Sequence, residues 1–241
     1  MWQWQYRITS PIYWVYNMNT VYIKNYPEPQ FNTKEVLRYS GADIHSSEMA
    51  EYAQRCMEEI KNKLIYKVCY CETDIKVSDN TVDFGYISTQ SKNLSYTLKE
   101  CKKAIIFCAT VGIGIDREIA ACMKRDVAKG FMFQAIGTER CESLCNEFVK
   151  DIKNEHMPEG IYLTPRFSPG YGDLSLDFQK DIFSLLDLPR KIGVTLNESL
   201  IMSPSKSVTA LIGLSPSPCF ITSSGCDACE KRNCLYRDDL K

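Results

Sequence analysis

The spacing of hydrophobic and polar residues predicts a chain of mixed helices and strands. Residues 46–62 and the positions just after them carry the clearest helical pattern, because apolar residues recur there at steps of three and four: Met49, Ala53, Cys56, Met57, Ile60 and Leu64. Ser46 or Ser47 can cap this helix, and Glu48 falls in its first turn, where a carboxylate is favourable. We therefore expect an amphipathic helix with one buried face.

The rest of the pattern predicts elements of both kinds. Further helices are expected at 91–103, 115–125, 130–154 and 176–188. Strands are expected at 65–71, 82–88, 104–112 and 207–214. The mixture of the two types, with no repeat period and no low-complexity tract, predicts an α/β or α+β domain.

Two terminal segments differ in composition from this central part. Residues 1–30 contain all three tryptophans and only three charged residues, and they end at Pro27 and Pro29, which break helices. This composition predicts an appended hairpin or arm that packs on the main body or on a partner. Residues 216–241 form a Cys-rich tail, which leaves 31–215 as the main domain.

Composition and charge narrow the class of partner. The 241 residues are 44% hydrophobic, and 29 basic residues face 30 acidic ones. A nearly neutral chain has no general electrostatic attraction to nucleic acid or to anionic lipid. No apolar run reaches the roughly 18 residues that a membrane span needs, and the N-terminus lacks the features of a secretory signal. We expect a soluble, cytoplasmic protein with no nucleic-acid or membrane partner.

The twelve cysteines fall into two groups. Eight are scattered singly through the predicted helices and strands, where they are expected to be small buried residues with reduced thiols. The other four, in the tail, are separated by six, two and four residues: Cys219, Cys226, Cys229 and Cys234. Four close thiolates suit structural zinc or an iron–sulfur cluster. Free thiols on a tail are the alternative, and Cys219 could be a spectator.

Two other features of the sequence do not indicate a nucleotide, metal or catalytic site. Gly112 and Gly114 follow a buried strand and precede a helix, but the third glycine of a dinucleotide fingerprint and a Walker lysine are both missing. A tight strand-to-helix turn is the better interpretation, with Asp116 favouring the helix N-terminus. His45 and His156 show no spacing typical of a zinc site or a catalytic triad.

The stretch TPRFSPGYGDL, residues 164–174, combines groups that could hold a small molecule. Arg166 offers a planar fork for a carboxylate or phosphate, Tyr171 a flat ring with a hydroxyl, and Asp173 a carboxylate. The Pro169–Gly170 step makes a turn in which glycine allows close approach. On these residues alone, a ligand clamp competes with an ordinary surface turn.

A second stretch, IGVTLNESLIMSPSKSVT at 192–209, has a simple interpretation as a capped turn. Together, however, the two stretches resemble the activation (reactivation) domain of cobalamin-dependent methionine synthase. That family carries an Arg-Pro-x-Pro-Gly-Tyr turn and, later, Thr-Glu-Ser-x-x-Met-x-Pro followed by Ser-Val. Here Arg166–Tyr171 and Asn197–Pro204 occupy those places, in the same order. The resemblance covers residues 31–215.

The resemblance implies an S-adenosylmethionine site. Arg166 would hold the methionine carboxylate, and Tyr171 and the backbone near it would hold the rest of the ligand. A glutamate on a preceding helix completes the site in the family, and Glu142 is the best counterpart, with Glu139 as a competitor. The full set implied as S-adenosylmethionine-binding is Arg166, Ser168, Gly170, Tyr171 and Glu142. The second motif is implied to be corrinoid-facing or structural through Glu198, Ser199, Met202 and Pro204.

The resemblance also implies a fold and a function. The fold is α+β, with a bent, largely antiparallel sheet flanked by helices. The function is reductive remethylation of an inactive cobalt(II) corrinoid on a separate methionine synthase fragment or corrinoid protein, with a flavodoxin or ferredoxin as possible electron donor. The chain would then be an accessory component of a methyltransferase, with cobalamin carried by its partner.

This sequence departs from the family at three places. Gly-Asp-Leu-Ser replaces Pro-Ala-Cys-Pro after Tyr171, Asn197 replaces threonine, and Leu211-Ile212-Gly213 replaces an aromatic stretch. Two other functions stay open, the first because the Pro-Ala-Cys-Pro segment is missing and the second because of the four cysteines of the tail. One is a non-catalytic docking or chaperone module for a corrinoid protein. The other is a redox protein that uses a C-terminal iron–sulfur cluster.

Overall fold

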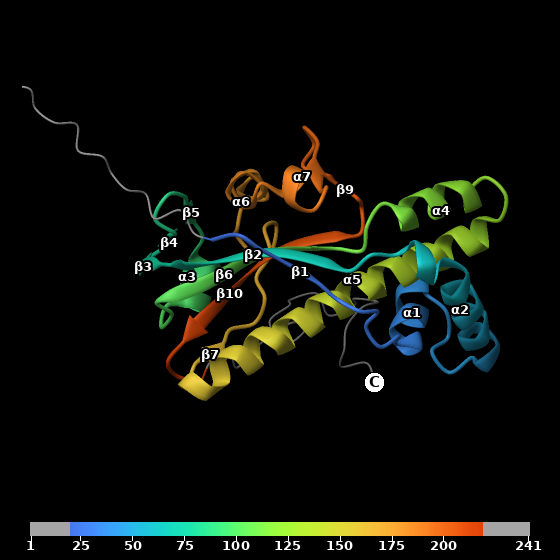
Figure 1. The fold of residues 1–241 in the computed structure, drawn as a ribbon, viewed down its shortest axis with the longest axis horizontal. Coiled ribbons are helices and arrows are strands. Elements are labelled where there is room, and N and C mark those ends of the chain that lie inside the picture. The colour runs from blue at the N-terminus through green and yellow to red at the C-terminus, as the bar shows by residue number, and fades with distance from the viewer. Residues whose placement is uncertain (1–19, 219–241) are drawn as a thin grey trace, which may run out of the picture.

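The computed structural model describes residues 20–218 (Figure 1). The predicted metal ligands Cys219, Cys226, Cys229 and Cys234 lie outside these residues, as does most of the aromatic N-terminal arm. The described part mixes helices with a sheet whose strand pairs are all antiparallel, so the predicted α+β fold is confirmed. No helix in this part has the length and apolar character that a membrane crossing requires.

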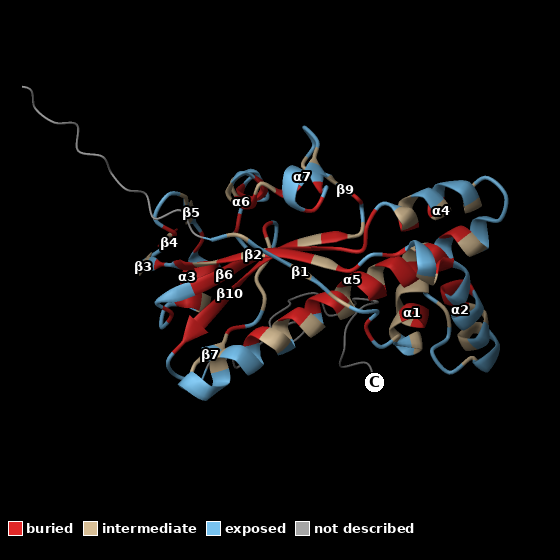
Figure 2. Ribbon diagram, in the orientation of Figure 1, coloured by how far each residue is buried: buried red, intermediate tan, exposed pale blue. Residues whose placement is uncertain are grey.

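The main sheet has five strands in the order β1-β2-β6-β10-β7. Their bounds are β1 (Tyr22–Asn25), β2 (Lys67–Asp74), β6 (Lys103–Thr110), β10 (Ser207–Ser215) and β7 (Tyr162–Leu163). Strand β6 lies in the middle and pairs along its length with β2 on one side and β10 on the other. Residues 104–110 are all buried, because both faces of this strand are covered (Figure 2).

The two faces of the sheet build two hydrophobic cores. Phe107 faces the long helix α5 (Val127–His156), where its ring meets Phe148 at 4.8 Å between centroids. Ile106, the adjacent residue of β6, faces the opposite core with Phe178 of α6 (Phe178–Leu186). Successive side chains of a strand point to opposite faces, so one strand serves both cores.

The remaining helices lie around this frame. Figure 1 shows α1, α2 and α4 gathered beside the N-terminal half of α5. Their bounds are α1 (Thr33–Ser40), α2 (Ser47–Ile60), α3 (Lys92–Leu98), α4 (Gly114–Cys122) and α7 (Leu188–Lys191). Short 3-10 turns follow α2 at 61–63 and α5 at 157–159.

The predicted helices are confirmed, with some changes at their ends. The Ser46 side chain caps α2 by accepting a hydrogen bond from the backbone N–H of Met49, as predicted. Helix α5 begins at Val127 rather than at 130, because Asp126 caps it through the N–H of Lys129. The helix expected at 91–103 ends at Leu98.

The strand predicted at 82–88 is wrong in its middle, because residues 84–87 form a turn. The chain forms β4 (Thr81–Asp83), turns, and returns as β5 (Ser88–Gln90), and with β3 (Lys76–Ser78) these strands make a separate three-stranded sheet. Gly85 has a φ of 92°, in the left-handed region, and the Asp83 carboxylate accepts a hydrogen bond from its N–H. A turn that requires glycine replaces the middle of the predicted strand.

Two elements near the N-terminus were not predicted. Tyr22–Asn25, within the predicted arm, forms the edge strand β1 and pairs with β2. Helix α1 follows, and Asn32 caps it by accepting a hydrogen bond from the N–H of Glu35. The described part of the arm therefore belongs to the main sheet, and the segment between β1 and α1 runs across α5.

Candidate functional site

The predicted ligand turn leaves the short edge strand β7 and passes along β10. Phe167 forms an antiparallel bridge with Leu211, through N–H to carbonyl hydrogen bonds of 2.9 and 2.8 Å. The Thr164 hydroxyl accepts a hydrogen bond of 2.8 Å from the N–H of Gly213. These contacts hold the chain on both sides of Pro165 and Arg166 against β10, and Arg166 extends from there to α5.

Arg166 meets two side chains of α5. Its Nη2 atom donates to Glu142 Oε2 at 2.8 Å and to Asn146 Oδ1 at 3.3 Å. Glu142 and Asn146 lie four residues apart, so one face of the helix presents both. The side chains of Arg166 and Glu142 are 26% and 39% exposed, so solvent and ligands can reach the pair.

The surroundings of the Arg166 guanidinium shift its pKa in opposite directions. Burial acts to lower the pKa of Arg166, but the neighbouring Cys145 and Glu142 act against it, and the pKa is raised overall. The group is therefore a permanent cation. A cation beside a carboxylate and an amide can bind a carboxylate ligand and an ammonium ligand at once.

The competing glutamate, Glu139, faces elsewhere. It is 1% exposed, and its Oε2 atom accepts a hydrogen bond of 2.6 Å from the Nε atom of Arg140, which is fully buried. Glu142 is thus the glutamate of this helix that meets Arg166. Arg166 of the turn and Glu142 of the preceding helix, both expected in the site, are brought together.

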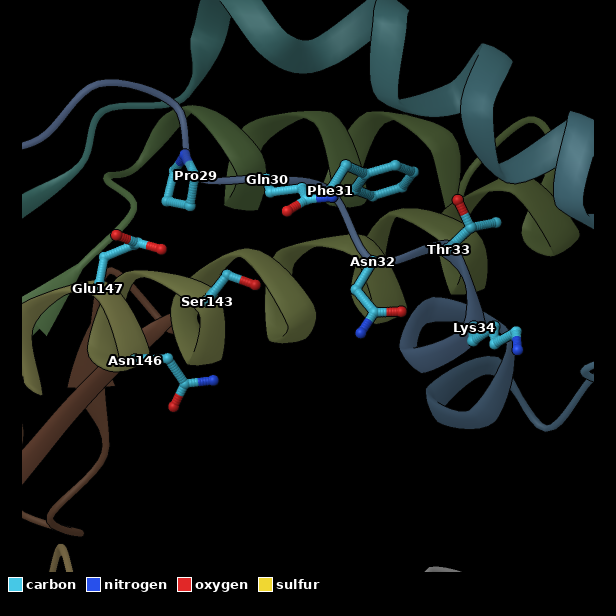
Figure 3. Close-up of a pocket in the computed structure, with 9 residues that line it drawn as sticks. All are labelled: Pro29, Gln30, Phe31, Asn32, Thr33, Lys34, Ser143, Asn146 and Glu147. Atoms are coloured by element: carbon cyan, nitrogen blue, oxygen red, sulfur yellow. The ribbon is translucent and has the colours of Figure 1, made fainter. Parts of the chain in front are cut away.

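A pocket of about 490 Å³ opens beside Asn146 (Figure 3). Its walls are the segment before α1 and one face of α5: Pro29, Gln30, Phe31, Asn32, Thr33, Lys34, Ser143, Asn146 and Glu147. Small-molecule sites typically measure roughly 300–1,000 Å³. The lining mixes amide, hydroxyl, carboxylate and ammonium groups with one aromatic ring. Asn146 also accepts a hydrogen bond from Arg166, so this one side chain connects the pocket wall with the ion pair.

The rest of the turn is closed by its own backbone. The N–H of Gly170 donates to the carbonyl of Leu174, and the N–H of Tyr171 donates to the carbonyl of Ser168, at 2.9 and 3.1 Å. Gly170 has a φ of 89°, which favours glycine. Tyr171 is 71% exposed, so its ring is not part of the core and is free to cover a ligand.

Asp173 has a structural role. Its carboxylate accepts hydrogen bonds from the Ser91 hydroxyl and from the N–H groups of Lys92 and Asn93, at the start of α3. The Ser91 bond is the main reason why the pKa of Asp173 is lowered. This carboxylate fastens the turn to α3 and does not belong to the Arg166 site.

The second motif forms a hairpin. Strands β8 (Thr195–Leu196) and β9 (Met202–Ser203) pair, and the Asn197 side chain closes the loop by accepting from the N–H of Ile201 at 2.9 Å. Glu198 and Ser199 lie at the exposed tip. Met202 is half-buried against the α6 core, and Pro204 is buried after a cis peptide bond. No hydrogen bond within residues 20–218 joins Glu198 or Ser199 to Arg166.

The residues after the hairpin fasten it to α4 and α5. The Asp116 carboxylate, in the first turn of α4, accepts hydrogen bonds from the N–H and hydroxyl of Ser205. Lys206 extends to Thr138 of α5, where its Nζ atom donates to the hydroxyl at 3.0 Å. The hairpin and the Arg166 site are therefore both attached to α5, at Thr138 and Glu142, one helical turn apart.

The other sequence features occupy structural positions. No disulfide joins any of the eight cysteines within the described part, and seven of them are buried. Among residues 20–218, no group of three or more His, Cys, Asp or Glu side chains is arranged to hold a metal ion. At Gly114 a Cβ atom would lie 2.0 Å from the carbonyl oxygen of Lys63, so the predicted tight turn needs glycine for close packing.

Sequence reasoning missed the pocket wall at 29–34 and the roles of Asn146 and Ser143. The helical spacing did carry a signal for Asn146, because it lies one turn after Glu142. Nothing in the sequence indicates that residues 29–34 cross α5, since the residues in contact are more than 100 positions apart in the chain.

The chain is similar to one known protein family and to a solved structure. The family described as "Vitamin B12 dependent methionine synthase, activation domain" matches residues 99–225. A solved structure titled "Crystal Structure of the MetH Reactivation Domain bound to AdoHcy" has a similar fold, with a TM-score of 0.61 and 14% sequence identity over 83% of this chain and 80% of that chain. No curated protein sequence matches at a significant level.

Proposed function

This chain belongs to the family of activation domains of vitamin B12 dependent methionine synthase, and on that premise we propose that it binds S-adenosylmethionine to support reductive remethylation of a cobalt(II) corrinoid. The corrinoid would be carried by a separate protein, a methionine synthase fragment or a corrinoid methyltransferase. The family match, together with the shared fold, supports a role in methionine synthase reactivation.

The observation that carries the proposal is the Arg166–Glu142 pair beside an open pocket. The amino-acid end of S-adenosylmethionine is a zwitterion, with a carboxylate and an ammonium on one carbon. Arg166 is matched to the carboxylate and Glu142 to the ammonium, so the ligand would replace one ion pair with two. A site with only one of the two charges would leave half of the zwitterion unpaired.

The pocket would take the remainder of the ligand. Its volume suits a molecule of this size, and Asn146 connects it to the guanidinium. The exposed ring of Tyr171 would cover the ligand. The backbone of Ser168 and Gly170 would approach it, since Gly170 has no Cβ. The similar domain was solved with AdoHcy, the product that S-adenosylmethionine leaves after methyl transfer, which supports this ligand class.

The protein's contribution to the reaction would be positioning. Remethylation needs one electron at cobalt and transfer of the sulfonium methyl group to cobalt, which breaks the sulfur–methyl bond and releases S-adenosylhomocysteine. Arg166 and Glu142 would fix the amino-acid end, so that the methyl group points out of the site toward the partner. Holding reacting groups in line and excluding water is an established source of rate enhancement, and it needs no acid or base from the protein.

The hairpin would form the partner-facing side. Glu198 and Ser199 are exposed at its tip, and Met202 and Pro204 set its base. Lys206 and Asp116 hold its end on α5 and α4. A corrinoid protein that docks on α5 next to Glu142 would therefore meet this hairpin. A flavodoxin or ferredoxin would supply the electron.

The tail is proposed as a metal site that is separate from the Arg166 site. Cys219, Cys226, Cys229 and Cys234 have the donor chemistry for zinc or an iron–sulfur cluster. A cluster could relay the electron, whereas zinc could only be structural. Metal analysis and the visible absorption spectrum of anaerobically purified protein separate the two. Colourless protein that contains zinc rules out the relay.

A non-catalytic docking module remains the second candidate. The observation in its favour concerns Asp173, one of the residues that replace the family's Pro-Ala-Cys-Pro stretch. Its carboxylate is hydrogen-bonded at the start of α3 and is not available to a ligand at Arg166. Following the cobalt(II) spectrum of a candidate partner with reductant and S-adenosylmethionine distinguishes the two functions. Loss of that spectrum supports remethylation, and an unchanged spectrum with stable complex formation supports docking alone.

Calorimetry with S-adenosylmethionine tests the ligand assignment. Wild-type protein should bind, and Arg166→Ala should bind at least about tenfold more weakly, since a charge-assisted bond contributes roughly 1.5–3 kcal/mol. Arg190→Ala is the control, because Arg190 is 86% exposed and its partner Asp187 lies 3.9 Å away. Equal binding by wild type and Arg166→Ala refutes the role of Arg166.

A further inference from the structure

Two neighbouring residues of α5 form a buried ion pair next to the ligand pocket. Arg140 is fully buried and Glu139 is 1% exposed. The guanidinium donates through Nε to Glu139 Oε2 at 2.6 Å and through Nη2 to Glu139 Oε1 at 2.7 Å. Consecutive residues of a helix normally point about 100° apart and do not face each other. Both side chains must turn toward a common target for this pair to form.

The common target is the segment that immediately precedes α1. Arg140 donates through Nη1 to the carbonyl of Pro29 at 2.6 Å and through Nη2 to the carbonyl of Gln30 at 2.8 Å. Glu139 Oε1 accepts from the backbone N–H of Asn32 at 3.1 Å. The guanidinium also lies 5.0 Å from the centre of the Phe31 ring. Four consecutive residues of the segment are thus held by the pair.

The held segment is one wall of the ligand pocket. In Figure 3, Pro29, Gln30, Phe31 and Asn32 run along one side, opposite Asn146. The network also reaches the α5 side, because the Ser143 hydroxyl, which lines the pocket, donates to Glu139 Oε1 at 2.6 Å. One carboxylate oxygen therefore connects the two walls.

Stability alone does not explain such a pair. Burying two charges carries a desolvation cost of several kcal/mol per ion, and well-packed apolar residues of similar volume often serve stability as well or better. An apolar pair, however, has no directional contacts and could not fix the backbone of residues 29–32. What the ion pair adds is geometry: it sets where the pocket wall lies relative to Asn146 and Arg166.

We propose that Glu139 and Arg140 are positioning residues for the ligand pocket, which hold residues 29–32 at the distance from α5 that S-adenosylmethionine requires. The role rests on the proposed function. Neither side chain touches the ligand. Loss of the network lets the segment move from α5, and the folded protein then binds the ligand weakly even though Arg166 and Glu142 are intact.

Glu139→Gln is the main test variant. It keeps an oxygen acceptor for Asn32 and Ser143 but removes the charge that pairs with Arg140. Arg140→Lys is the second variant, because it keeps the charge but cannot donate to Pro29 and Gln30 as a planar fork does. Thr73→Val is the matched control. It removes a buried polar group, 5% exposed and bonded to the carbonyl of Phe84, in a part of the fold that the pocket does not use.

Calorimetry with S-adenosylmethionine is done well below each variant's Tm, so that all proteins are folded. We expect Kd to rise about tenfold or more in Glu139→Gln and Arg140→Lys, since small misplacements in a binding site have large effects. Thr73→Val should lower Tm and leave Kd unchanged. A merely structural role predicts the Thr73→Val behaviour for all three variants, and that result overturns the proposal.

Hydrogen exchange separates this proposal from the ligand assignment and does not require that a variant folds. In wild-type protein the Asn32 amide should exchange slowly, and the ligand should slow the amides of residues 31–34 further. If wild type does not bind S-adenosylmethionine, both the proposed function and the positioning role are refuted. If it binds and these amides do not respond, only the positioning role is refuted.

Discussion

The Ser91 hydroxyl donates a hydrogen bond of 2.5 Å to the Asp173 carboxylate, and this contact joins the ligand turn to the first turn of α3. Two backbone N–H groups, of Lys92 and Asn93, donate to the same carboxylate at 2.7 and 3.2 Å. At Gly172 a Cβ would lie 2.4 Å from the Asn93 side chain, so the turn and α3 are also in close contact. The loop that carries Tyr171 is therefore fixed at its far end.

Asp173→Ala should lower the stability of the fold by about 1 kcal/mol, because removing a side chain that caps helix N–H groups has a cost of that order. The effect should depend on pH. The pKa of Asp173 is lowered in the folded state, so its contribution is fully present above its unfolded pKa of about 3.9 and is lost as the pH falls through the folded value.

Urea denaturation of wild type and Asp173→Ala between pH 3 and pH 7 provides the measurement. The difference in free energy of unfolding should be constant near neutral pH and should close in acid. Asp177→Ala is the control, since Asp177 bonds to Lys180 on an exposed surface. A difference between wild type and Asp173→Ala that stays constant down to pH 3 would show that the carboxylate charge is not what holds the turn.

The elements that could be predicted from the sequence are those with a clear pattern of apolar residues. Helix α2 shows apolar residues at helical steps, and β6 is a continuous apolar run, so both were found. Strand β1 was missed because its four residues are mostly exposed and alternate weakly. Pro29 looked like the end of an arm, whereas its carbonyl is bound by Arg140 from a helix 111 positions away. Such a contact leaves no local pattern.

In the candidate site, too, some residues could be predicted from the sequence and others could not. Arg166 was a candidate from its own turn, but a single arginine on a turn is physically ordinary, so its ligand role and the choice of Glu142 depended on a family resemblance. Glu139 was only a competitor of Glu142 and Arg140 was not identified, because helical periodicity cannot show that neighbouring side chains turn toward one buried segment. Only the crossing of residues 29–32 over α5 gives these charges a partner and the pocket a wall.

Glu142→Gln should weaken S-adenosylmethionine binding without a large loss of stability. The variant removes the charge proposed to pair with the ligand's ammonium, and we expect Kd to rise about tenfold. Stability should change by at most about 1 kcal/mol, because Glu142 is 39% exposed and exposed ion pairs contribute little.

Calorimetry and thermal denaturation measure the two effects, with Glu58→Gln as control. Glu58 pairs with Lys61 at 2.6 Å and is 55% exposed, so its loss has a similar electrostatic cost away from the pocket. Unchanged binding in Glu142→Gln would mean that the glutamate balances Arg166 in the free protein but does not hold the ligand.

Gly114→Ala should destabilise the fold by about 1–3 kcal/mol. The added Cβ would lie 2.0 Å from the Lys63 carbonyl oxygen, and the backbone there must move to admit it. Lys63→Ala is the control, because it removes the ion pair with Glu118 and leaves the carbonyl in place. Chemical denaturation should show a large loss for the glycine variant only. Near-equal stabilities would show that the strand-to-helix turn tolerates a side chain.

Lys206→Met should stabilise the free protein at pH 7. Burial lowers the pKa of Lys206, and the nearby Asp116 and Cys141 oppose this shift only in part. A lysine whose folded pKa is below its unfolded value of about 10.4 costs stability at neutral pH, and this cost disappears as the pH rises through both values. Methionine keeps the aliphatic stem that packs against Gly137 and removes the charge.

Thermal denaturation at pH 7 and pH 10 tests whether the charge of Lys206 lowers stability. Lys206→Met should raise the Tm at pH 7, and its advantage over wild type should shrink at pH 10. Lys180→Met, at a 62% exposed position, should change little at either pH. A lower Tm for Lys206→Met at pH 7 would mean that the bond to Thr138 outweighs the burial cost. A higher Tm would imply that the chain keeps a costly cation bonded to Thr138 of α5, one turn from Glu142, where the partner is proposed to dock.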